Sequence, residues 1–376
     1  MKMVKFTSVS VFCGIVLMVA GSFSAAVLAQ QDAAKRGQPA AAAKPLTGAG
    51  TSTMADLMTA WVSAYAKESN VKVGYNVVGA AAGVKQAIAR EVDFGVSDNP
   101  ISNAEAEKNG IVQFPMIVGG MIPVANVPGL AKDARLRLTA ATLADIYLGK
   151  ITKWNHPDIA AHNADVKLPD LAIAVFHRAD PAGTTAVFTR YLARTHEQFR
   201  KDVGVGTMVK WKVGKGETGA NNVAKAVLAT AGGIGFLDYA AFLRNKGLIA
   251  VELRNLSARF MAPDSYSIRS AADSPNWLRV IPEMVARESI TFDLTDTPGI
   301  TGYPLVTFTY VLMPKAPADS QRARAVLQFF NWAFGDAGST LASGIGLSPL
   351  PDAVRDGVRT LLKQSVKDAS GTPVWQ

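Results

Sequence analysis

Apolar and polar positions along the chain follow two different periods. Short apolar or alternating runs are typical of strands, whereas longer runs with apolar residues three or four positions apart are typical of helices. The runs typical of strands span residues 46–50, 71–78, 94–97, 172–177, 233–238 and 303–313. The runs typical of helices span residues 52–68, 83–90, 142–148, 184–194, 219–230, 320–334 and 353–366. This alternation predicts an α/β fold with mostly parallel sheets.

Two segments of small and hydroxyl-bearing residues stand directly before predicted helices. They are residues 46–53, with the sequence LTGAGTST, and residues 178–185, with the sequence RADPAGTT. The first turn of a helix has backbone N–H groups without an internal partner, and the helix dipole adds partial positive charge there. Such a start binds anions readily. We therefore predict one anion held between two parts of the chain.

The first segment offers the hydroxyls and backbone amides of Ser52 and Thr53, and Asp98 follows the predicted strand 94–97. An ionised carboxylate only accepts hydrogen bonds, so it repels an anion unless a proton lies between them. Phosphate has such a proton near neutral pH and sulfate does not. We expect Asp98 to favour the protonated anion. The alternatives are a helix cap for Ser52 and Thr53 and a turn residue for Asp98.

The second segment offers Arg178, whose guanidinium can donate two parallel hydrogen bonds to an oxyanion. Asp180 would orient Arg178, Gly183 would allow close approach of the backbone, and Thr184 would add a hydroxyl and an amide. The alternatives are a surface ion pair between Arg178 and Asp180 and an ordinary turn at Gly183.

The N-terminal residues predict an export signal. Lys2 and Lys5 precede the apolar run 11–21, and small residues at the usual cleavage positions place the cut after Ala29. An uncleaved membrane anchor is the alternative. Cys13, the only cysteine of the chain, lies inside this run. We therefore expect a periplasmic protein without disulfides, with residues 1–29 as signal peptide and residues 30–45 as a disordered lead-in.

Composition and motifs exclude several other functions. The net charge of +9 helps to attract anions, but the chain has no basic run of the kind that nucleic-acid binders usually show. Gly214-Lys215-Gly216 fails the phosphate-loop pattern, which needs glycine at Val209. No metal-ligand spacing is found among the histidines, which are His156, His162, His177 and His196. We expect no metal, no cofactor and no catalytic residue. A phosphatase using the same pocket and a surface scaffold protein are the alternatives.

Several motifs in register resemble one family. They are LTGAG at 46–50, GVKQ at 83–86, VDFGVSD at 92–98, YLGKITKWN at 147–155, RAD at 178–180 followed by Gly183-Thr184, VKW at 209–211 and FFNWA at 329–333. From about Leu46 to the C-terminus the chain resembles the periplasmic phosphate-binding proteins of ABC-type high-affinity phosphate transporters.

This resemblance implies the periplasmic binding protein fold, with two α/β lobes and a ligand cleft between them. Lobe one would comprise residues 46–119 plus 300–376, and lobe two residues 120–299. The protein would be a monomer that binds inorganic phosphate without reaction and delivers it to the membrane permease subunits. The positions that match the family's ligand residues are Ser52, Thr53, Ala80, Asp98, Arg178, Asp180, Ala182, Gly183 and Thr184.

The chain departs from the family at three of these positions and at one neighbouring position. Ala80 and Ala182 stand where the family usually has serine, and Thr51 and Thr53 stand where it usually has alanine and phenylalanine. A hydrogen bond to a charged group is worth about 1.5–3 kcal/mol, so two lost hydroxyls weaken binding unless they are replaced. Our hypothesis is that Thr51 and Thr53 partly replace them. The alternative is a pocket adapted to arsenate or phosphite.

Overall fold

The computed structural model describes residues 44–131 and 134–375. The chain divides into two units, Met1–Pro45 and Leu46–Gln376, and every described helix and strand lies in the second. The predicted signal peptide, residues 1–29, and all but the last two residues of the predicted lead-in lie outside the described residues.

The strands of the second unit join into one sheet with the order β2-β1-β3-β11-β4-β8-β6-β7, and β9 pairs with β4, β5 and β10. The strand bounds are β1 (Leu46–Gly50), β2 (Val73–Val77), β3 (Phe94–Ser97), β4 (Ile111–Asn126), β5 (Leu136–Leu138), β6 (Ala174–Arg178), β7 (Lys215–Glu217), β8 (Gly233–Asp238), β9 (Ile249–Arg254), β10 (Phe260–Met261) and β11 (Val306–Pro314).

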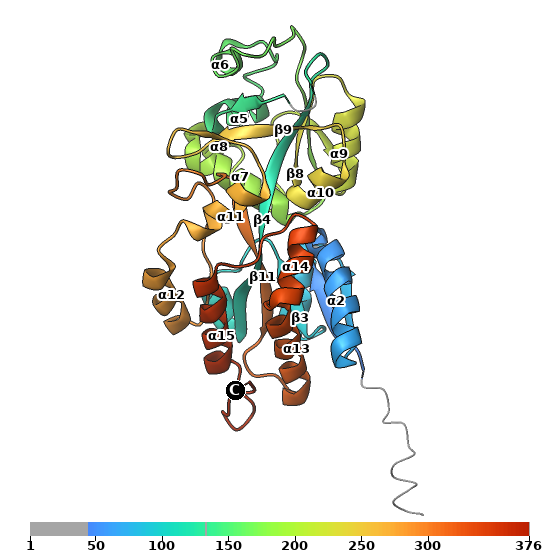
Figure 1. The fold of residues 1–376 in the computed structure, drawn as a ribbon, viewed down its shortest axis with the longest axis vertical. Coiled ribbons are helices and arrows are strands. Elements are labelled where there is room, and N and C mark those ends of the chain that lie inside the picture. The colour runs from blue at the N-terminus through green and yellow to red at the C-terminus, as the bar shows by residue number, and fades with distance from the viewer. Residues whose placement is uncertain (1–43, 132–133, 376) are drawn as a thin grey trace, which may run out of the picture. The chain divides into compact units, whose positions relative to one another are not determined.

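Helices alternate with these strands and pack against the sheet (Figure 1). Their bounds are η1 (Ser52–Met54), α2 (Ala55–Ser69), α3 (Ala80–Ile88), α4 (Asn103–Lys108), α5 (Ala140–Tyr147), α6 (Pro157–Ala160), α7 (Gly183–Thr195), α8 (Glu197–Asp202), α9 (Ala220–Ala229), α10 (Tyr239–Arg244), α11 (Ser265–Asp273), α12 (Trp277–Ala286), α13 (Ser320–Ala333), α14 (Asp336–Gly344) and α15 (Asp352–Ser365). None of them, in the described part of the chain, combines the length and apolar character needed to cross a membrane.

The α/β fold class predicted from the sequence is confirmed, and β1, β3 and β8 have the predicted bounds. The expectation of mostly parallel sheets is wrong. β1 runs parallel to β2 and β3, and β6 runs parallel to β7 and β8, but β4 is antiparallel to β11, β8 and β9. Two long antiparallel strands therefore join the parallel groups, a pairing that no local pattern reveals because it links segments far apart in the chain.

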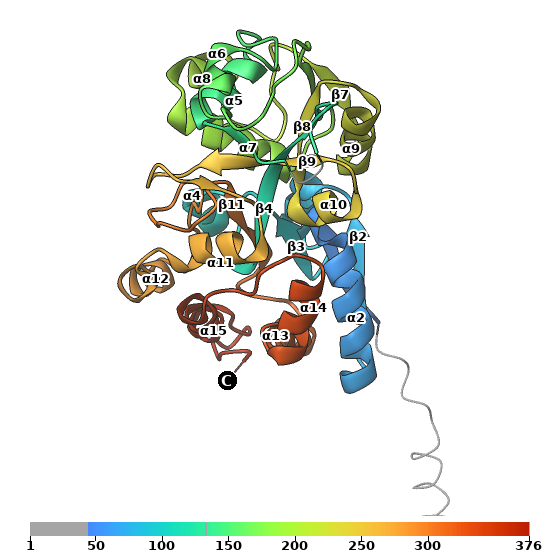
Figure 2. The same ribbon diagram turned by 45° about the horizontal axis from the view of Figure 1, so that its top comes forward.

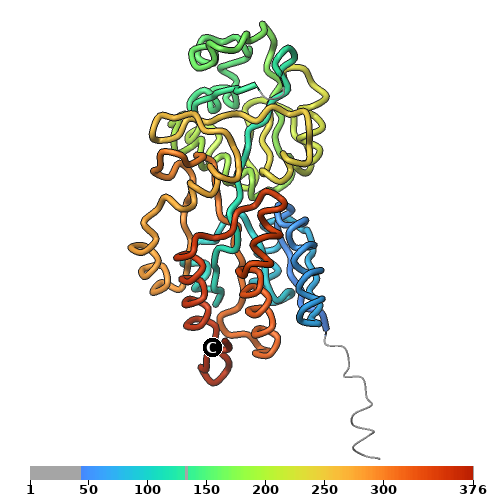
Figure 3. The backbone as a smooth tube through the Cα atoms, viewed as in Figure 1, coloured from blue at the N-terminus to red at the C-terminus, as the bar shows by residue number. Residues whose placement is uncertain are grey.

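β4 is a single strand of 16 residues that changes partners along its length. Residues 111–120 pair with β11, and residues 121–126 pair with β8. We call β2, β1, β3, β11 and residues 111–120 of β4 the first half-sheet. Residues 121–126 of β4 with β8, β6 and β7 form the second half-sheet. Figure 3 follows the path of the backbone along β4 from one half-sheet to the other.

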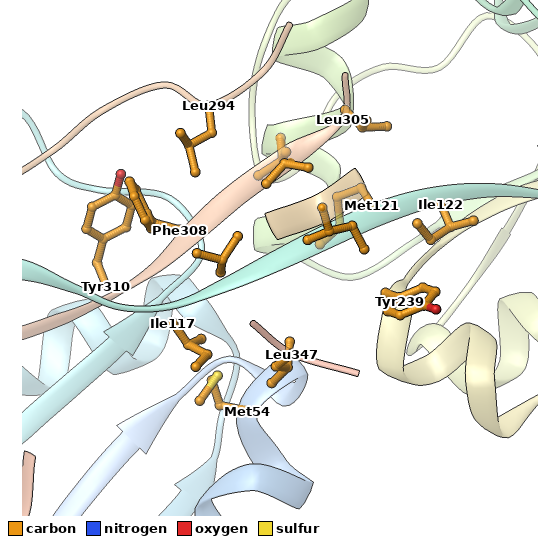
Figure 4. Close-up of a cluster of buried hydrophobic side chains, with 14 of the residues drawn as sticks. Met54, Ile117, Met121, Ile122, Tyr239, Leu294, Leu305, Phe308, Tyr310 and Leu347 are labelled. Carbon is orange, nitrogen blue, oxygen red and sulfur yellow. The ribbon is translucent and has the colours of Figure 1, made fainter. Parts of the chain in front are cut away.

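A buried hydrophobic cluster lies where β4 passes between the half-sheets (Figure 4). Ile117 and Met121 of β4 lie there with Phe308 of β11, and all three are at most 2% exposed. Met54 at the end of η1 and Leu347 after α14 also belong to this cluster. Burial of large apolar side chains stabilises the fold by roughly 1.5–3 kcal/mol each, so this cluster fixes the segments that surround it.

The segment from α11 to residue 293 packs against the first half-sheet. Trp277 of α12 contacts Phe308 of β11 with ring centroids 5.9 Å apart, and Ser289 forms a β-bridge with Gln113 of β4. α12 also packs on α15, where Ile281 lies against Gly357. The lobe boundaries expected at residues 119 and 299 stay a prediction. The contacts above place α12 against β11 and α15.

Gly83 of α3 sets how closely this helix approaches β1. A Cβ at Gly83 would lie 2.5 Å from the carbonyl oxygen of Ala49 and 2.5 Å from the Cα of Gly50. Backbone cannot give way as a side chain can, so the helix would have to move. The close approach brings the start of α3 to the end of β1.

We expect Gly83→Ala to lower the free energy of unfolding by about 1–3 kcal/mol, as overpacking does in other cores. Denaturant unfolding followed by circular dichroism measures the change. Gly344→Ala is the matched control, because a Cβ at Gly344 would have no heavy atom within 4 Å. Equal stability of the two variants would contradict this account of the packing of α3.

Candidate functional site

The predicted site residues follow the carboxyl ends of strands in both half-sheets. Thr51 follows β1, Asp98 follows β3, and Arg178 ends β6. Ligands in α/β proteins bind beyond this edge of the sheet, because the carboxyl ends of parallel strands meet there. The structure brings the two groups of strand ends together around Asp98, as the following contacts show.

The Asp98 carboxylate is buried at 1% exposure and accepts hydrogen bonds from three threonine hydroxyls. Thr51 Oγ1 donates to Oδ2 at 2.6 Å, and Thr309 Oγ1 donates to Oδ1 at 2.8 Å. Thr53 Oγ1 lies 2.9 Å from Oδ1 and 3.1 Å from Oδ2. We call the hydroxyls of Thr51, Thr53 and Thr309 the threonine cage. Thr51 precedes η1, Thr53 lies in η1, and Thr309 lies in β11.

Thr309 was not predicted from the sequence, because it lies in the middle of a strand. The antiparallel register pairs Tyr310 with Ser97, which sets Thr309 beside the residue after Ser97, namely Asp98. The pairing of β11 with β4 also shifts by one position between Thr309 and Tyr310. Such irregularities redirect side chains near functional sites. Only the pairing of two distant strands reveals this contact.

Burial raises the pKa of Asp98 above its usual range, while the hydrogen bonds from Thr51, Thr309 and Thr53 and the charge of Arg178 act in the opposite direction. Two further ionisable groups lie close by. Burial and the charge of Asp98 raise the pKa of Tyr75, and burial raises the pKa of Asp238, with Asp98 adding to that rise. Asp98 is therefore a buried acid whose charge depends on its few polar neighbours.

The start of α7 lies directly against Asp98. A Cβ at Gly183 would be 2.8 Å from both the Cβ and the Oδ2 of Asp98, so only glycine allows this contact. Ala182, the N-cap residue, makes no side-chain hydrogen bond to the helix start. Thr184 is buried at 3% exposure, and the buried hydroxyl of Thr185 has no hydrogen-bond partner among the described residues. The N–H groups in the first turn of α7 thus lie near the Asp98 carboxylate, and the N-cap side chain does not bond to them.

Arg178 is held in place by Asp180. Its Nε donates to Asp180 Oδ1 at 2.7 Å, and its Nη2 donates to Oδ2. The backbone N–H of Gly219 donates to Asp180 Oδ1 at 3.0 Å. Burial opposes the charge of Asp180, but the bonds from Arg178 and Gly219 outweigh it and lower the pKa. A guanidinium fixed at two of its nitrogens keeps its other N–H groups oriented.

The start of α3 lies near the second segment. Ala80 is the first residue of α3 and is 2% exposed, and its N-cap residue Gly79 has a φ of 88°. A Cβ at Gly79 would lie 3.7 Å from the carbonyl oxygen of Pro181. Ala182 is buried as well, at 5% exposure. Ala80 and Ala182, which the resemblance matches to serines, are therefore both buried at helix starts.

The first segment differs from its prediction in one respect. Ser52 is exposed and Thr53 is half-buried, whereas Thr51, which was not in the predicted ligand set, is buried. Each threonine hydroxyl has a single proton, and those of Thr51 and Thr53 point to Asp98. In this arrangement neither hydroxyl has a proton to spare for an anion, so the structure gives no support to the hypothesis that they replace the lost serine donors.

Further contacts connect the two half-sheets around the site. Arg244 of α10 forms an ion pair with Asp56 of α2, and Arg190 of α7 donates to the side chain of Asn99. Figure 2 shows α10 beside the upper end of α2 and beside β2. These polar contacts, together with Gly183 against Asp98, connect the segments around the site to one another. Within the described ranges no group of three or more His, Cys, Asp or Glu side chains could hold a metal ion.

Comparison with known proteins identifies related chains. The model of the PBP superfamily domain matches residues 29–337. The chain is 36% identical to the phosphate-binding protein PstS of Pasteurella multocida over 334 residues, which cover 89% of this chain and 94% of that protein. It is 35% identical to the phosphate-binding protein PstS of Haemophilus influenzae over 329 residues, which cover 88% of this chain and 96% of that protein.

The fold is similar to that of solved structures. The crystal structure of a phosphate-binding protein from Stenotrophomonas maltophilia superposes with a TM-score of 0.61 at 19% sequence identity. The match covers 84% of this chain and 93% of that one. At this low identity the comparison concerns the fold only.

Proposed function

Because the chain belongs to the PBP superfamily and, within it, to the family of the phosphate-binding protein PstS, we propose that it captures inorganic phosphate for an ABC transporter. It acts as a binding protein that holds the anion by hydrogen bonds and releases it unchanged. The ligands are the N–H groups at the starts of α7 and α3, the guanidinium of Arg178 and the carboxylate of Asp98. Ser52, at the start of η1, offers its backbone amide.

One observation supports this proposal above the others. The buried carboxylate of Asp98 lies against Gly183, at the start of a helix whose cap residue makes no side-chain bond to it. A helix start favours an anion, whereas a carboxylate opposes one unless the anion supplies a proton. The pair therefore favours an anion that keeps a proton, as phosphate does near neutral pH.

We further propose that the protein opens and closes around β4. One lobe contains the first half-sheet with α11 to α15, and the other contains the second half-sheet with α5 to α10. The chain crosses between them at residues 120–121 and again between β9 and α11. Since Asp98 and Gly183 touch, phosphate enters only after they separate. The ligand then favours the closed form because it contacts both sides.

Calorimetric titration with phosphate and sulfate at acid, neutral and alkaline pH tests the proposed function. We expect phosphate to bind at neutral and mildly alkaline pH, where it keeps a proton, and sulfate not to bind there. The raised pKa of Asp98 makes this group neutral as the pH falls, so sulfate binding should appear only on the acid side. Equal affinity for both anions at neutral pH would refute the role of Asp98.

A second ligand deserves a parallel titration because Ala80 and Ala182 are both buried at the site and have no hydroxyl to donate. Phosphite has a P–H group where phosphate has a P–OH group, so it needs fewer partners. Tighter binding of phosphite than of phosphate would assign the protein to that anion. Arsenate, which has the same proton and geometry as phosphate, is titrated in parallel, and tighter binding of arsenate than of phosphate would assign the protein to arsenate.

The proposal places the protein in the periplasm as a monomer that docks on the membrane permease subunits. The basic and apolar residues before residue 30 support export. Fractionation of cells that produce the full chain and light scattering of the mature protein test the location and the oligomeric state.

A further inference from the structure

The hydrogen bonds around Asp98 have a consequence for how the site distinguishes anions. A carboxylate offers about four acceptor positions. Thr309 and Thr53 occupy Oδ1, and Thr51 occupies one position of Oδ2, with a weaker share of Thr53. Oδ2 is also the oxygen that faces Gly183 at the start of α7. One acceptor position therefore remains on Oδ2, the oxygen that lies next to the helix start.

We propose that Thr51, Thr53 and Thr309 are positioning residues that act through Asp98 and set the preference for phosphate over sulfate. All three donate to the carboxylate, and donors favour the charged form of an acid. With three positions filled, the charged carboxylate has room for one further proton donor. That donor is the P–OH group of phosphate. This inference rests on the proposed function and names the residues that decide its specificity.

The surrounding charges are consistent with this role. Arg178 at the end of β6 favours the charged form of Asp98, whereas burial opposes it. Tyr75 of β2 donates to the carbonyl oxygen of Thr51 at 2.8 Å and is itself affected by the charge of Asp98. Asp238, at the end of β8, is a second acid close enough to interact with Asp98. Without the threonine cage, burial and the charge of Asp238 would disfavour the charged form of Asp98, and only Arg178 would favour it.

A threonine hydroxyl could donate either to the anion or to Asp98, and its removal affects the binding of phosphate and sulfate differently in the two cases. If a threonine donated to the anion, its loss would weaken phosphate and sulfate binding alike. If it donates to Asp98, its loss lets Asp98 take up a proton more readily. The protonated acid is neutral and donates a hydrogen bond, so it accepts sulfate.

Thr309→Val and Thr309→Ser separate these two roles. Valine keeps the branched shape without the hydroxyl, and serine keeps the hydroxyl. We expect Thr309→Val to lower the phosphate-to-sulfate affinity ratio by a factor of about ten or more, since the loss of one hydrogen bond to a charged group has about that effect. The onset of sulfate binding should also move to higher pH. Thr309→Ser should behave as the wild type, and Thr51→Val should act in the same direction as Thr309→Val.

Thr59→Val is the matched control, because Thr59 is exposed on α2 and its hydroxyl bonds only to the carbonyl oxygen of Ala55 among the described contacts. Calorimetry with phosphate and sulfate gives the affinities. Carbon-13 NMR of labelled aspartate carboxyls gives the titration of Asp98 directly, without any ligand. A Thr309→Val protein with an unchanged ratio and an unchanged Asp98 titration would overturn the proposal.

The outcomes also separate this inference from the proposed function. A wild-type protein that binds no phosphate would defeat the proposed function and, with it, the role of the cage in specificity. A wild-type protein that binds phosphate, combined with a Thr309→Val protein in which both affinities fall together, would defeat only the cage. If Thr309→Val does not fold, its circular dichroism signal will be lost. The phosphate-to-sulfate affinity ratio of Thr51→Val then tests the proposal.

Discussion

Replacing Arg178 by methionine is expected to weaken phosphate binding by about a hundredfold or more, which is the loss of one or two charge-assisted hydrogen bonds. Arg178 is 9% exposed and is fixed by Asp180 through two of its nitrogens. Its positive charge also favours the charged form of Asp98. Removing the guanidinium leaves Asp98 and Asp180 without their cationic partner.

The exchange Arg178→Lys separates charge from geometry. Lysine keeps the positive charge but cannot donate through a planar fork to Asp180 and the anion together. We expect an affinity between those of the wild type and Arg178→Met. Calorimetry with phosphate measures all three proteins. Arg287→Met is the control, because Arg287 pairs on the surface with Glu283. Unchanged phosphate affinity in Arg178→Met would remove Arg178 from the site.

The second large effect is expected at Gly183. Gly183→Ala should lower phosphate affinity by roughly tenfold to a hundredfold, because relieving an overpacked contact costs about 1–3 kcal/mol. The new methyl group would lie 2.8 Å from the Cβ and Oδ2 of Asp98. Either α7 moves away from Asp98, or the carboxylate rotates out of its bonds to Thr51 and Thr309. Both changes separate the helix start from the acid.

Titration calorimetry measures the affinity of Gly183→Ala, and thermal unfolding without ligand reports whether the helix still packs. Gly74→Ala is the control, since its nearest heavy atom would be the carbonyl oxygen of Leu46 at an ordinary 3.8 Å. If Gly183→Ala bound phosphate as tightly as the wild type, then the contact between α7 and Asp98 would have no part in binding.

The sequence by itself determined the local parts of this protein. The period of apolar residues predicted the α/β class and the bounds of β1, β3 and β8, because such strands are buried short runs between turns. The start of α7 at Gly183 was predicted one residue later, at Thr184, and the position of Asp98 after β3 was also predictable. Each depends on residues a few positions apart, and the chemistry of a strand end or a helix start is encoded there.

The tertiary structure alone decided how these parts meet. The contact of Thr309 with Asp98 follows from the register between β11 and β3, which lie more than two hundred residues apart. The same holds for the antiparallel course of β4 and for the packing of α12 on α15. The hydroxyls of Thr51 and Thr53 were visible in the sequence, but their direction was not. A hydroxyl has one proton, and which acceptor receives it depends on the side chain that folding places opposite.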